Sequence, residues 1–398
     1  MHVGMSSLAG VTVAERALGF YFHVPFCASR CGYCDFNTYT AAELGTDVAT
    51  ISRDTWHEYA AREITLARAA ECLAGDERVV STVFFGGGTP TQVPAQNLVA
   101  TLAVLRQEFG LATGAEVTTE ANPDSVDAQS LDVLRAGGFT RISFGHQSSS
   151  VRVLQLLERT HTPGRTWAAV AQAQAAGFEH INVDLIYGTP GETDDDLRRT
   201  LDDVIAFGVD HVSAYSLIVE PGTRMAARVA RGEMPIPDDD VAAQRYAIID
   251  ETLSAAGLQW YEVSNWAKPG AQCEHNLIYW RNHDWWGVGP GAHSHMQGQR
   301  WWNHKHPATW ARALSQGQSV MADSEIVDQR AQELEAVMLG LRLREGIALA
   351  SLEPAAQVAA QALLHDGLLE HQPFDDGRVV LTSAGRLLAD AVIRSLTP

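Results

Sequence analysis

The sequence has few cysteines, a shortage of positive charge and no long apolar run. Its 398 residues carry 29 Lys and Arg against 48 Asp and Glu, a formal net charge of −19. A surface this acidic repels nucleic acid and anionic membranes, because binding to either depends on cationic side chains. No stretch approaches the roughly 18 apolar residues that a membrane-spanning helix needs. We therefore expect neither a nucleic-acid partner nor a transmembrane segment.

The amino-terminal residues and the cysteine count indicate the compartment. Residues 1–19 do not have the pattern of a secretory signal, since Glu15 and Arg16 interrupt the apolar stretch. Five cysteines are an odd number, which argues against a disulfide framework in a chain of this length. Two of them, Cys72 and Cys273, are expected to be bystanders. The sequence predicts a cytoplasmic protein; peripheral membrane contact stays an open alternative that would work against the charge.

Short runs rich in β-branched and aromatic residues alternate with Ala-rich stretches of helical periodicity. The runs cover residues 19–25, 79–85, 116–120, 140–145, 181–187 and 209–219. Strands that alternate with helices predict a parallel sheet covered by helices. Six such units predict an α/β fold with a partial (β/α)6 barrel rather than the full set of eight. In such barrels the functional residues gather where the strands end.

Changes in composition predict three domains. Proline and glycine residues at 221–222 and 234–237 predict that a core barrel covers residues 1–235. A middle extension is predicted over 236–322, in which seven of the ten Trp lie between Trp260 and Trp302 and six of the fifteen His lie between His275 and His306. The order of elements over 323–398 resembles a winged helix, with a hairpin formed by 368–370 and 379–381. Because residues 325–398 carry six Arg and no Lys against eleven Asp and Glu, we do not expect this domain to bind DNA.

Three cysteines follow the first predicted strand with the spacing C-x3-C-x2-C, at Cys27, Cys31 and Cys34. Soft thiolate ligands on one short loop select an iron–sulfur cluster or zinc. A structural zinc site would need a fourth ligand. His23 is a candidate, but it lies along a strand and would have to turn back. The spacing thus indicates a three-thiolate metal site, with a zinc knuckle as the alternative.

The cysteine motif, with Gly86-Gly87-Gly88-Thr89-Pro90 after the second predicted strand, resembles the radical S-adenosylmethionine (SAM) superfamily. In that superfamily three cysteines hold a [4Fe–4S] cluster, whose open iron is chelated by SAM. An electron from the cluster can then cleave SAM to a deoxyadenosyl radical. The resemblance implies a [4Fe–4S] cluster on Cys27, Cys31 and Cys34, and S-adenosyl-L-methionine as a second cofactor.

The same resemblance implies which residues hold SAM. A glycine run lets the backbone approach a ligand closely, carboxylates suit ribose hydroxyls or an amino group, and a guanidinium suits a carboxylate. The alternative for each polar residue is an ordinary strand-end contact or a surface ion pair. The predicted SAM residues are Tyr21, Gly87, Gly88, Thr89, Glu120, Gln147, Arg159 and Asp184.

Over residues 19–398 the sequence is similar to the oxygen-independent coproporphyrinogen III oxidase-like group. The motifs that carry this likeness are residues 21–25 (YFHVP), 184–188 (DLIYG), 261–265 (YEVSN) and 340–342 (GLR). The group contains a coproporphyrinogen III dehydrogenase of heme synthesis. It also contains heme chaperones of the HemW type, which bind heme and pass it to acceptor proteins.

Three features favour the chaperone branch. Phe36 stands where the dehydrogenase has a further cysteine, and only 26 residues precede Cys27, where the dehydrogenase carries a long arm. Residues 275–280 (HNLIYW) match the HNxxYW heme-binding motif of the chaperones. We therefore predict a heme chaperone that has heme and a heme-acceptor protein as partners. Oxidative decarboxylation of coproporphyrinogen III is the alternative, a radical enzyme with an unrelated substrate is a third, and whether the chain is an enzyme stays open.

The composition of the middle segment also suits heme. A porphyrin needs aromatic walls, an axial ligand and cations near its propionates. The Trp-rich stretch from 260 to 302, with Arg281 and Arg300, offers such groups, and His275 or Tyr279 is the predicted heme ligand. The alternative is that the Trp residues form a core and the His residues are satisfied internally.

Overall fold

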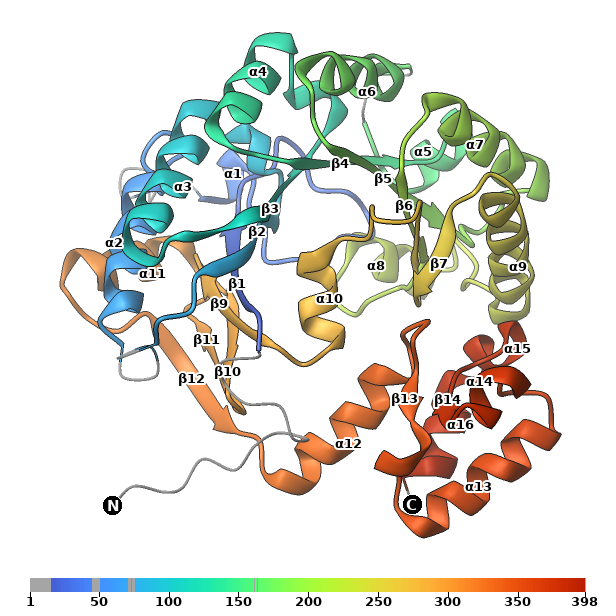
Figure 1. Ribbon diagram of the computed structural model, residues 1–398. Coiled ribbons are helices and arrows are strands. Elements are labelled where there is room, and N and C mark those ends of the chain that lie inside the picture. Colours follow the sequence, from blue (N-terminus) through green and yellow to red (C-terminus); the bar gives the residue numbers. More distant parts are fainter. Residues whose placement is uncertain are drawn as a thin grey trace, which may run out of the picture.

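A curved sheet forms the centre of the protein in the computed structural model, which describes residues 16–44, 51–70, 73, 76–160, 162 and 164–397 (Figure 1). Cys72 lies outside the described residues. The strand order is β12-β11-β10-β9-β1-β2-β3-β4-β5-β6-β8-β7. The strands are β1 (Leu18–Val24), β2 (Val80–Gly87), β3 (Leu111–Ala121), β4 (Arg141–Gln147), β5 (His180–Tyr187), β6 (His211–Ser216), β7 (Gln259–Glu262), β8 (Asn265–Ala267), β9 (Asp284–Val288), β10 (His293–Met296), β11 (Gln299–Asn303) and β12 (Met321–Ile326).

The strands from β1 to β6 are parallel neighbours, as the alternation of strands and helices predicts. A seventh parallel strand, β9, pairs with β1 and comes from the predicted middle segment. Helices cover the outer face of this arc (Figure 1). Strand β1 is buried at six of its seven residues, whereas β3 to β6 also carry polar residues such as Glu120, Ser143 and Asn182 that line the interior. The predicted partial barrel is present, and the middle segment completes its sheet on both sides.

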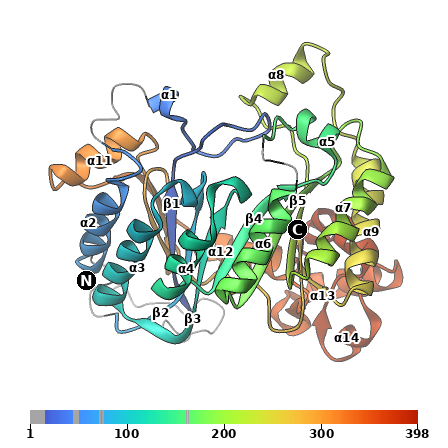
Figure 2. The same ribbon diagram turned by 90° about the horizontal axis from the view of Figure 1, so that it is seen from above.

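The helices have the following bounds. They are α1 (Ala41–Leu44), α2 (Trp56–Arg68), α3 (Ala95–Phe109), α4 (Ala128–Gly137), α5 (Val151–Leu156), α6 (Arg165–Ala176), α7 (Asp194–Phe207), α8 (Arg224–Ala230), α9 (Asp239–Ala255), α10 (Glu274–Trp280), α11 (Pro307–Ser315), α12 (Gln329–Gly340), α13 (Pro354–His365), α14 (His371–Asp375), α15 (Ser383–Leu387) and α16 (Ala389–Leu396). Seen from above, the loop after β1 and helices α1 and α8 lie at one end of the sheet, and α13 and α14 lie toward the other (Figure 2).

The carboxyl-terminal residues have a hydrophobic core of their own, made by buried side chains between Leu341 and Leu396. Thr382 caps α15 by accepting from the N–H of Gly385 (3.0 Å). The two segments of the predicted hairpin do pair, since Leu369 forms an antiparallel bridge with Leu381 and the N–H of Glu370 donates to Val380 O (2.9 Å). The prediction missed the helical turn at residues 371–375 and the pairing of β14 (Arg378–Val379) with β13 (Ile347–Ala348). The predicted domain boundaries stay a prediction.

A buried carboxylate joins α2 to the strands of the middle segment. Glu63 accepts three hydrogen bonds, from the N–H of Gly289 (2.9 Å), from Asn303 Nδ2 (2.7 Å) and from Trp310 Nε1 (2.7 Å). Only a group that accepts at both oxygens satisfies three donors at once. Glu63 therefore holds the Gly289 loop against the barrel.

Among the described residues, no helix is both long and apolar enough to span a membrane.

We predict that Glu63→Gln lowers the free energy of unfolding by about 1–3 kcal/mol, since the amide would present an N–H to a site that already contains three donors. Urea denaturation of the purified protein measures this. Glu58→Gln changes an exposed carboxylate of the same helix and should leave the midpoint unchanged. Equal stability of the two variants would contradict the role given to Glu63.

Candidate functional site

The cysteine loop leaves the carboxyl end of β1 and is fastened at three points. Cys27 donates its N–H to Tyr39 O (3.0 Å), Gly32 donates to Leu157 O (3.1 Å), and the N–H of Met225 in α8 donates to Gly32 O (2.8 Å). The three predicted cluster ligands, Cys27, Cys31 and Cys34, are free thiols. The loop thus presents them at the strand ends, where the sequence predicts the site.

Each thiol has a polar neighbour. Thr89 Oγ1 lies 4.0 Å from Cys27 Sγ, and Thr38 Oγ1 lies 4.0 Å from Cys34 Sγ. The guanidinium of Arg159 lies closer, with Nη1 at 3.5 Å from Cys31 Sγ. Burial raises the pKa of Cys27 and of Cys34, and the neighbouring thiols raise both further. The thiols therefore need a cationic partner to ionise together. Among the described residues, no three His, Cys, Asp or Glu side chains lie so that they could hold one metal ion.

The glycine run after β2 packs against the cysteine loop. Gly88 donates to Val24 O and Thr89 donates to Phe26 O, both at 2.8 Å. A Cβ on Gly88 would lie 2.6 Å from Phe26 O, and one on Gly87, whose φ is +104°, would lie 2.5 Å from the His23 ring. Glycine is thus required here by the packing of the two loops, a reason that the sequence analysis missed.

His23 is not placed as a fourth ligand of the cysteine loop. Its Nε2 bonds to Asn37 O (2.9 Å) and its Nδ1 to the hydroxyl of Tyr21 (3.1 Å). Burial lowers the pKa of His23, so the ring is neutral at ordinary pH. His23 therefore supports the glycine run and positions Tyr21.

Two of the predicted SAM residues are carboxyls that face the barrel interior. Glu120 accepts from the N–H of Gly87 (3.2 Å), and Asp184 bonds to Ser143 Oγ (2.8 Å) and to Asn182 Nδ2 (2.8 Å). Burial, together with the nearby Asp184, raises the pKa of Glu120 to about 8. Burial raises the pKa of Asp184 as well. Two repelling, desolvated carboxyls make this a site that favours a cationic ligand.

Gln147 and Arg159 contain polar atoms that the described residues leave unpartnered. Gln147 ends β4 with φ +63°, an uncommon conformation for a residue other than glycine, and its buried Oε1 has no hydrogen-bond partner among them. The buried Nε of Arg159 likewise has none, while its Nη2 donates to Gly145 O (3.1 Å). A strained residue and two unpartnered buried atoms beside the thiols fit a polar ligand.

One interior cavity of about 130 Å³ brings together residues from distant parts of the chain. Its wall includes Tyr21, Glu120 and Asp184 from the strand ends, and also His275 and Tyr279 from α10. Helix α10 lies across the opening between β1 and β6 (Figure 1). Three of the eight predicted SAM residues therefore share one cavity with the two predicted heme residues, whereas Gly87, Gly88, Thr89, Gln147 and Arg159 do not line it.

Helix α10 is held in place by an ion pair from the barrel. Glu116 accepts from the N–H of His275 (2.9 Å) and of Glu274 (3.2 Å), and it pairs with Arg141 Nε (2.9 Å). The guanidinium of Arg141 also donates to the carbonyls of Ala271 and Gln272 (2.5 and 2.8 Å). The pair thus binds both the first N–H groups of α10 and the chain before it.

His275 is sealed in this arrangement. It is 1% exposed, its Nδ1 bonds to Thr82 Oγ1 (2.8 Å) and its Nε2 bonds to the hydroxyl of Tyr279 (2.9 Å). Its ring stacks on Phe84 at 5.3 Å between centroids. Burial lowers the pKa of His275 to about 3. The ring is neutral, as a metal ligand must be, but neither nitrogen is free while α10 is docked.

The other predicted heme groups are not gathered around His275. Four of the Trp residues in the 260–302 stretch belong to the core: Trp260, Trp266, Trp286 and Trp301. Arg281 pairs with Glu345 (3.0 Å), and Arg300 pairs with Glu335 (2.5 Å). Of the aromatic residues, Trp285 lies beside Tyr279, at 4.8 Å between ring centroids.

Sequence reasoning missed a polar network in the cavity wall. Asn182 Nδ2 bonds to Asp184, to Ser143 and to Ser213 Oγ (3.0 Å), and Asn182 Oδ1 bonds to His211 Nδ1 (2.6 Å). His211 Nε2 in turn bonds to the hydroxyl of Tyr261 (2.8 Å). The signal was present, because Asn182 is two residues before Asp184 and so shares its strand face. Cys273, predicted to be a bystander, also lines this cavity.

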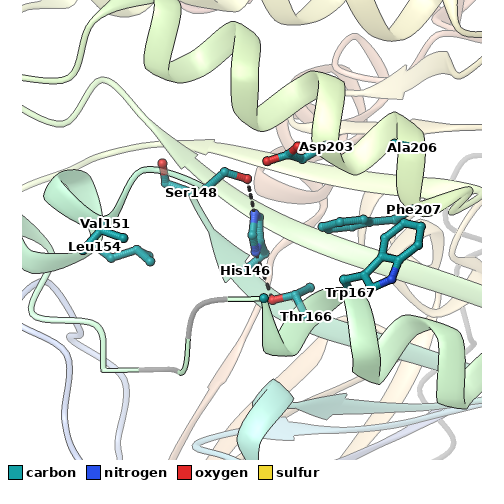
Figure 3. Close-up of a pocket in the computed structure, with 11 residues that line it drawn as sticks. His146, Ser148, Val151, Leu154, Thr166, Trp167, Asp203, Ala206 and Phe207 are labelled. Atoms are coloured by element: carbon teal, nitrogen blue, oxygen red, sulfur yellow. Dashed lines mark hydrogen bonds between the residues drawn. The ribbon is translucent and has the colours of Figure 1, made fainter.

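A second pocket, of about 370 Å³, lies outside the barrel between β4, α6 and α7 (Figure 3). His146 bonds to Thr166 Oγ1 and to Ser149 Oγ, both at 3.0 Å, and the rings of Trp167 and Phe207 lie 5.3 Å apart. Its lining residues do not include those predicted to bind SAM or heme.

Comparisons with known proteins agree with this arrangement. The radical SAM superfamily profile matches residues 21–204, and the HemN C-terminal domain profile matches residues 327–388. A protein named heme chaperone HemW from Mycobacterium tuberculosis is 51% identical over 381 residues, which is 96% of this chain and 95% of that one. The protein of the same name from Bacillus subtilis is 30% identical and covers 94% of this chain and 97% of its own.

A solved structure shows the same fold. The coproporphyrinogen III oxidase HemN from Escherichia coli, a radical SAM enzyme, superposes with a TM-score of 0.80 at 22% identity. The match covers 98% of this chain and 92% of that one. The chain therefore belongs to the radical SAM superfamily and, within it, to the HemW/HemN-like group.

Proposed function

We propose that this protein is a heme chaperone, which binds heme, passes it to an acceptor protein, and carries a [4Fe–4S] cluster and SAM. The observation that carries the proposal is the shared cavity, since His275 and Tyr279 of the HNxxYW segment line it together with Glu120 and Asp184. The naming of the relatives from M. tuberculosis and B. subtilis supports the same function. A cytoplasmic location is part of the proposal.

The cysteine loop would hold the cluster. Cys27, Cys31 and Cys34 supply three thiolates, and Arg159 near Cys31 stabilises negative charge on the sulfurs. With the cluster bound, the site supplies one-electron chemistry at an open iron. Thr38 and Thr89 orient the loop beside two of the sulfurs.

The strand ends would hold SAM. Glu120 and Asp184 accept from its amino group or ribose hydroxyls, while Arg159 offers the unpartnered Nε to its carboxylate and Gln147 offers Oε1 to a donor. Tyr21 lines the cavity beside these carboxyls, and Gly87, Gly88 and Thr89 would complete the site next to the cysteine loop, to which Thr89 bonds at Phe26 O. The cationic ligand lowers the cost of ionising two neighbouring carboxyls, which the free protein resists.

Heme binding would require α10 to move. Both ring nitrogens of His275 are engaged, by Thr82 and by Tyr279, and the ring is 1% exposed. We infer that α10 leaves the Glu116–Arg141 pair, so that His275 or Tyr279 becomes free to ligate the iron and Trp285 flanks the porphyrin.

Decarboxylation of coproporphyrinogen III is the alternative function. The E. coli enzyme of this name shares the fold, but its identity to this chain is too low to carry its activity over. Phe36 stands where the dehydrogenase has a further cysteine, and it is 64% exposed in the loop beside Cys34. This departure at the cluster loop favours the chaperone function.

We predict that Cys31→Ala abolishes cluster binding, because a cubane with an open iron needs all three thiolates. After anaerobic reconstitution, iron and sulfide content and the visible absorption of the cluster should fall to background. Cys273→Ala removes a buried thiol that lies off the loop and should reconstitute like the wild type. Wild-type iron content in Cys31→Ala would contradict the cluster assignment.

We predict that SAM binds more tightly as the pH rises, because Glu120, whose pKa is about 8, must ionise to accept from the ligand. Between about pH 6 and about pH 8 the affinity should rise by up to about tenfold per pH unit. Equilibrium dialysis with reconstituted protein measures this. Glu120→Gln should bind weakly with a flatter pH profile, whereas Asp132→Asn, a change at an exposed carboxylate, should behave like wild type. An identical profile in Glu120→Gln would remove this residue from the site.

We predict that His275→Ala loses or shifts the Soret band that appears when the wild type is titrated with heme. His293→Ala alters an exposed histidine of the same segment and should leave the band unchanged. Hydrogen exchange in the amides of α10 should also speed up when heme binds, since Glu116 releases them. A Soret band that His275→Ala leaves unaltered would remove His275 as ligand, and then Tyr279→Phe tests the phenol.

The function itself is tested by two reactions of the reconstituted protein under anoxia. Heme-loaded protein should transfer its heme to an apo-hemoprotein, which optical spectroscopy follows. With coproporphyrinogen III, SAM and a reductant, it should form no protoporphyrinogen. Clear formation of protoporphyrinogen would establish the enzymatic alternative instead.

A further inference from the structure

Strand β12 is an open edge of the sheet. Among the described strands it pairs only with β11, and all six of its residues, Met321–Ile326, are exposed. Ile326 is 84% exposed. The other edge, β7, differs, because Glu262 forms a bridge with Leu343 and Arg344 donates to Tyr261 O (2.9 Å). The carboxyl-terminal residues thus contact one edge of the sheet, while β12 offers its free side to another chain.

The register shows which backbone groups are free. Strands β10 and β11 are joined by a two-residue hairpin turn, in which Gln297 and Gly298 both have positive φ. The residues that flank this turn, Met296 and Gln299, therefore form a hydrogen-bonded pair. By alternation, Arg300 and Trp302 turn their N–H and C=O groups toward β12, opposite Glu325 and Asp323. The bond from Val327 N to Gly298 O (2.8 Å) agrees with this register.

The N–H and C=O groups of Ser324 and Ile326 therefore point away from the sheet, while the register shifts at Ala322. Within β12 the N–H of Ser324 donates to the Asp323 carboxylate (2.8 Å), a contact that a partner strand would replace. A strand added here would place its non-hydrogen-bonded residues opposite Asp323 and Glu325, where cross-strand side chains approach most closely.

The face that carries these two residues is acidic and aromatic. Asp323 lies opposite Trp302, whose indole stacks on His293 at 5.6 Å between centroids. Glu325 lies opposite Arg300, but that guanidinium forms its close, bidentate pair with Glu335 (2.5 and 2.8 Å) and lies 3.6 Å from Glu325. A lysine or arginine opposite Asp323 would meet both a carboxylate and an indole.

A second copy of the chain does not fit this edge in an antiparallel pair. In an antiparallel pair, residues whose backbone groups point outward must lie opposite each other. When two copies of β12 overlap at their centres, each acidic residue, Asp323 or Glu325, therefore lies opposite an acidic residue of the other copy. Like charges directly opposite destabilise a sheet. The same carboxylates select a strand of opposite charge.

We propose that β12 is a docking strand for an extended segment of a partner protein with lysine or arginine at alternate positions. The partner adds a strand through the outward backbone groups of Ser324 and Ile326, and its basic side chains face Asp323 and Glu325. This docking strand does not depend on the proposed heme function, since it lies at the sheet edge and not at the cavity.

The test uses the full chain and a fluorescein-labelled peptide in which lysine and valine alternate, flanked by threonine. Fluorescence anisotropy should show saturable binding that weakens with salt. A peptide of the same composition with its lysines adjacent should bind more weakly, because adjacent side chains point to opposite faces of a strand. Ser324→Pro removes an outward N–H and should weaken binding about tenfold.

Charge variants separate docking from general attraction. Asp323→Asn with Glu325→Gln should weaken binding about fivefold. Asp375→Asn with Asp376→Asn changes the net charge equally at exposed positions of the carboxyl-terminal core and should have no effect. The double variant Asp323→Asn with Glu325→Gln also tests the proposal if Ser324→Pro fails to fold.

Three outcomes would overturn the proposal. One is equal binding of the alternating and adjacent-lysine peptides, and another is binding that neither the proline nor the paired charge variant weakens. The third is self-association of the wild type, measured by sedimentation, that Ser324→Pro abolishes, since that would make a second copy the occupant.

Discussion

Parallel pairing of neighbouring strands is the constraint on which the candidate site depends. Because the strands run the same way, their carboxyl ends meet at one end of the barrel. The register then sets Gly145 beside Asp184, and Ser143 beside both Glu120 and Asn182. The cysteine loop, the glycine run and the two carboxyls are separated by up to about 150 residues of sequence, and yet they face a common interior.

That interior contains three buried carboxyl groups. Glu120, Asp184 and Glu262 all have their pKa raised by burial, that of Glu262 to about 7. They are tolerated because amide and hydroxyl groups of the wall satisfy them, as Asn182 and Ser143 satisfy Asp184. Such an arrangement opposes ionisation of the carboxyls, which a cationic ligand would favour, and this suits a ligand site better than a structural core.

Helix α10 joins the two halves of the proposed function. The Glu116–Arg141 pair docks it into the barrel, and its His275 and Tyr279 then line a cavity together with Tyr21, Glu120 and Asp184. Both ring nitrogens of His275 are engaged in this position, so the proposed ligation of heme by His275 would require these contacts to break.

Local patterns in the sequence determined much of this. The six strands, the three-thiolate loop and the strand-end polar residues follow from alternation, from spacing and from turn residues, which are properties of a few consecutive positions. The family resemblance assigned their roles, and the individual ligand assignments are still predictions. Phe36 and the HNxxYW segment could also be read without a structure, because each is a local identity.

Only the tertiary structure decided what these segments meet. It placed β9 beside β1, enclosed His275 between Thr82 and Tyr279, and added β13 beside β14. It also showed that Gly87 and Gly88 are required by contacts with the neighbouring loop. These contacts join residues that are far apart in the chain, and their partners are chosen by packing, which no short stretch of sequence encodes.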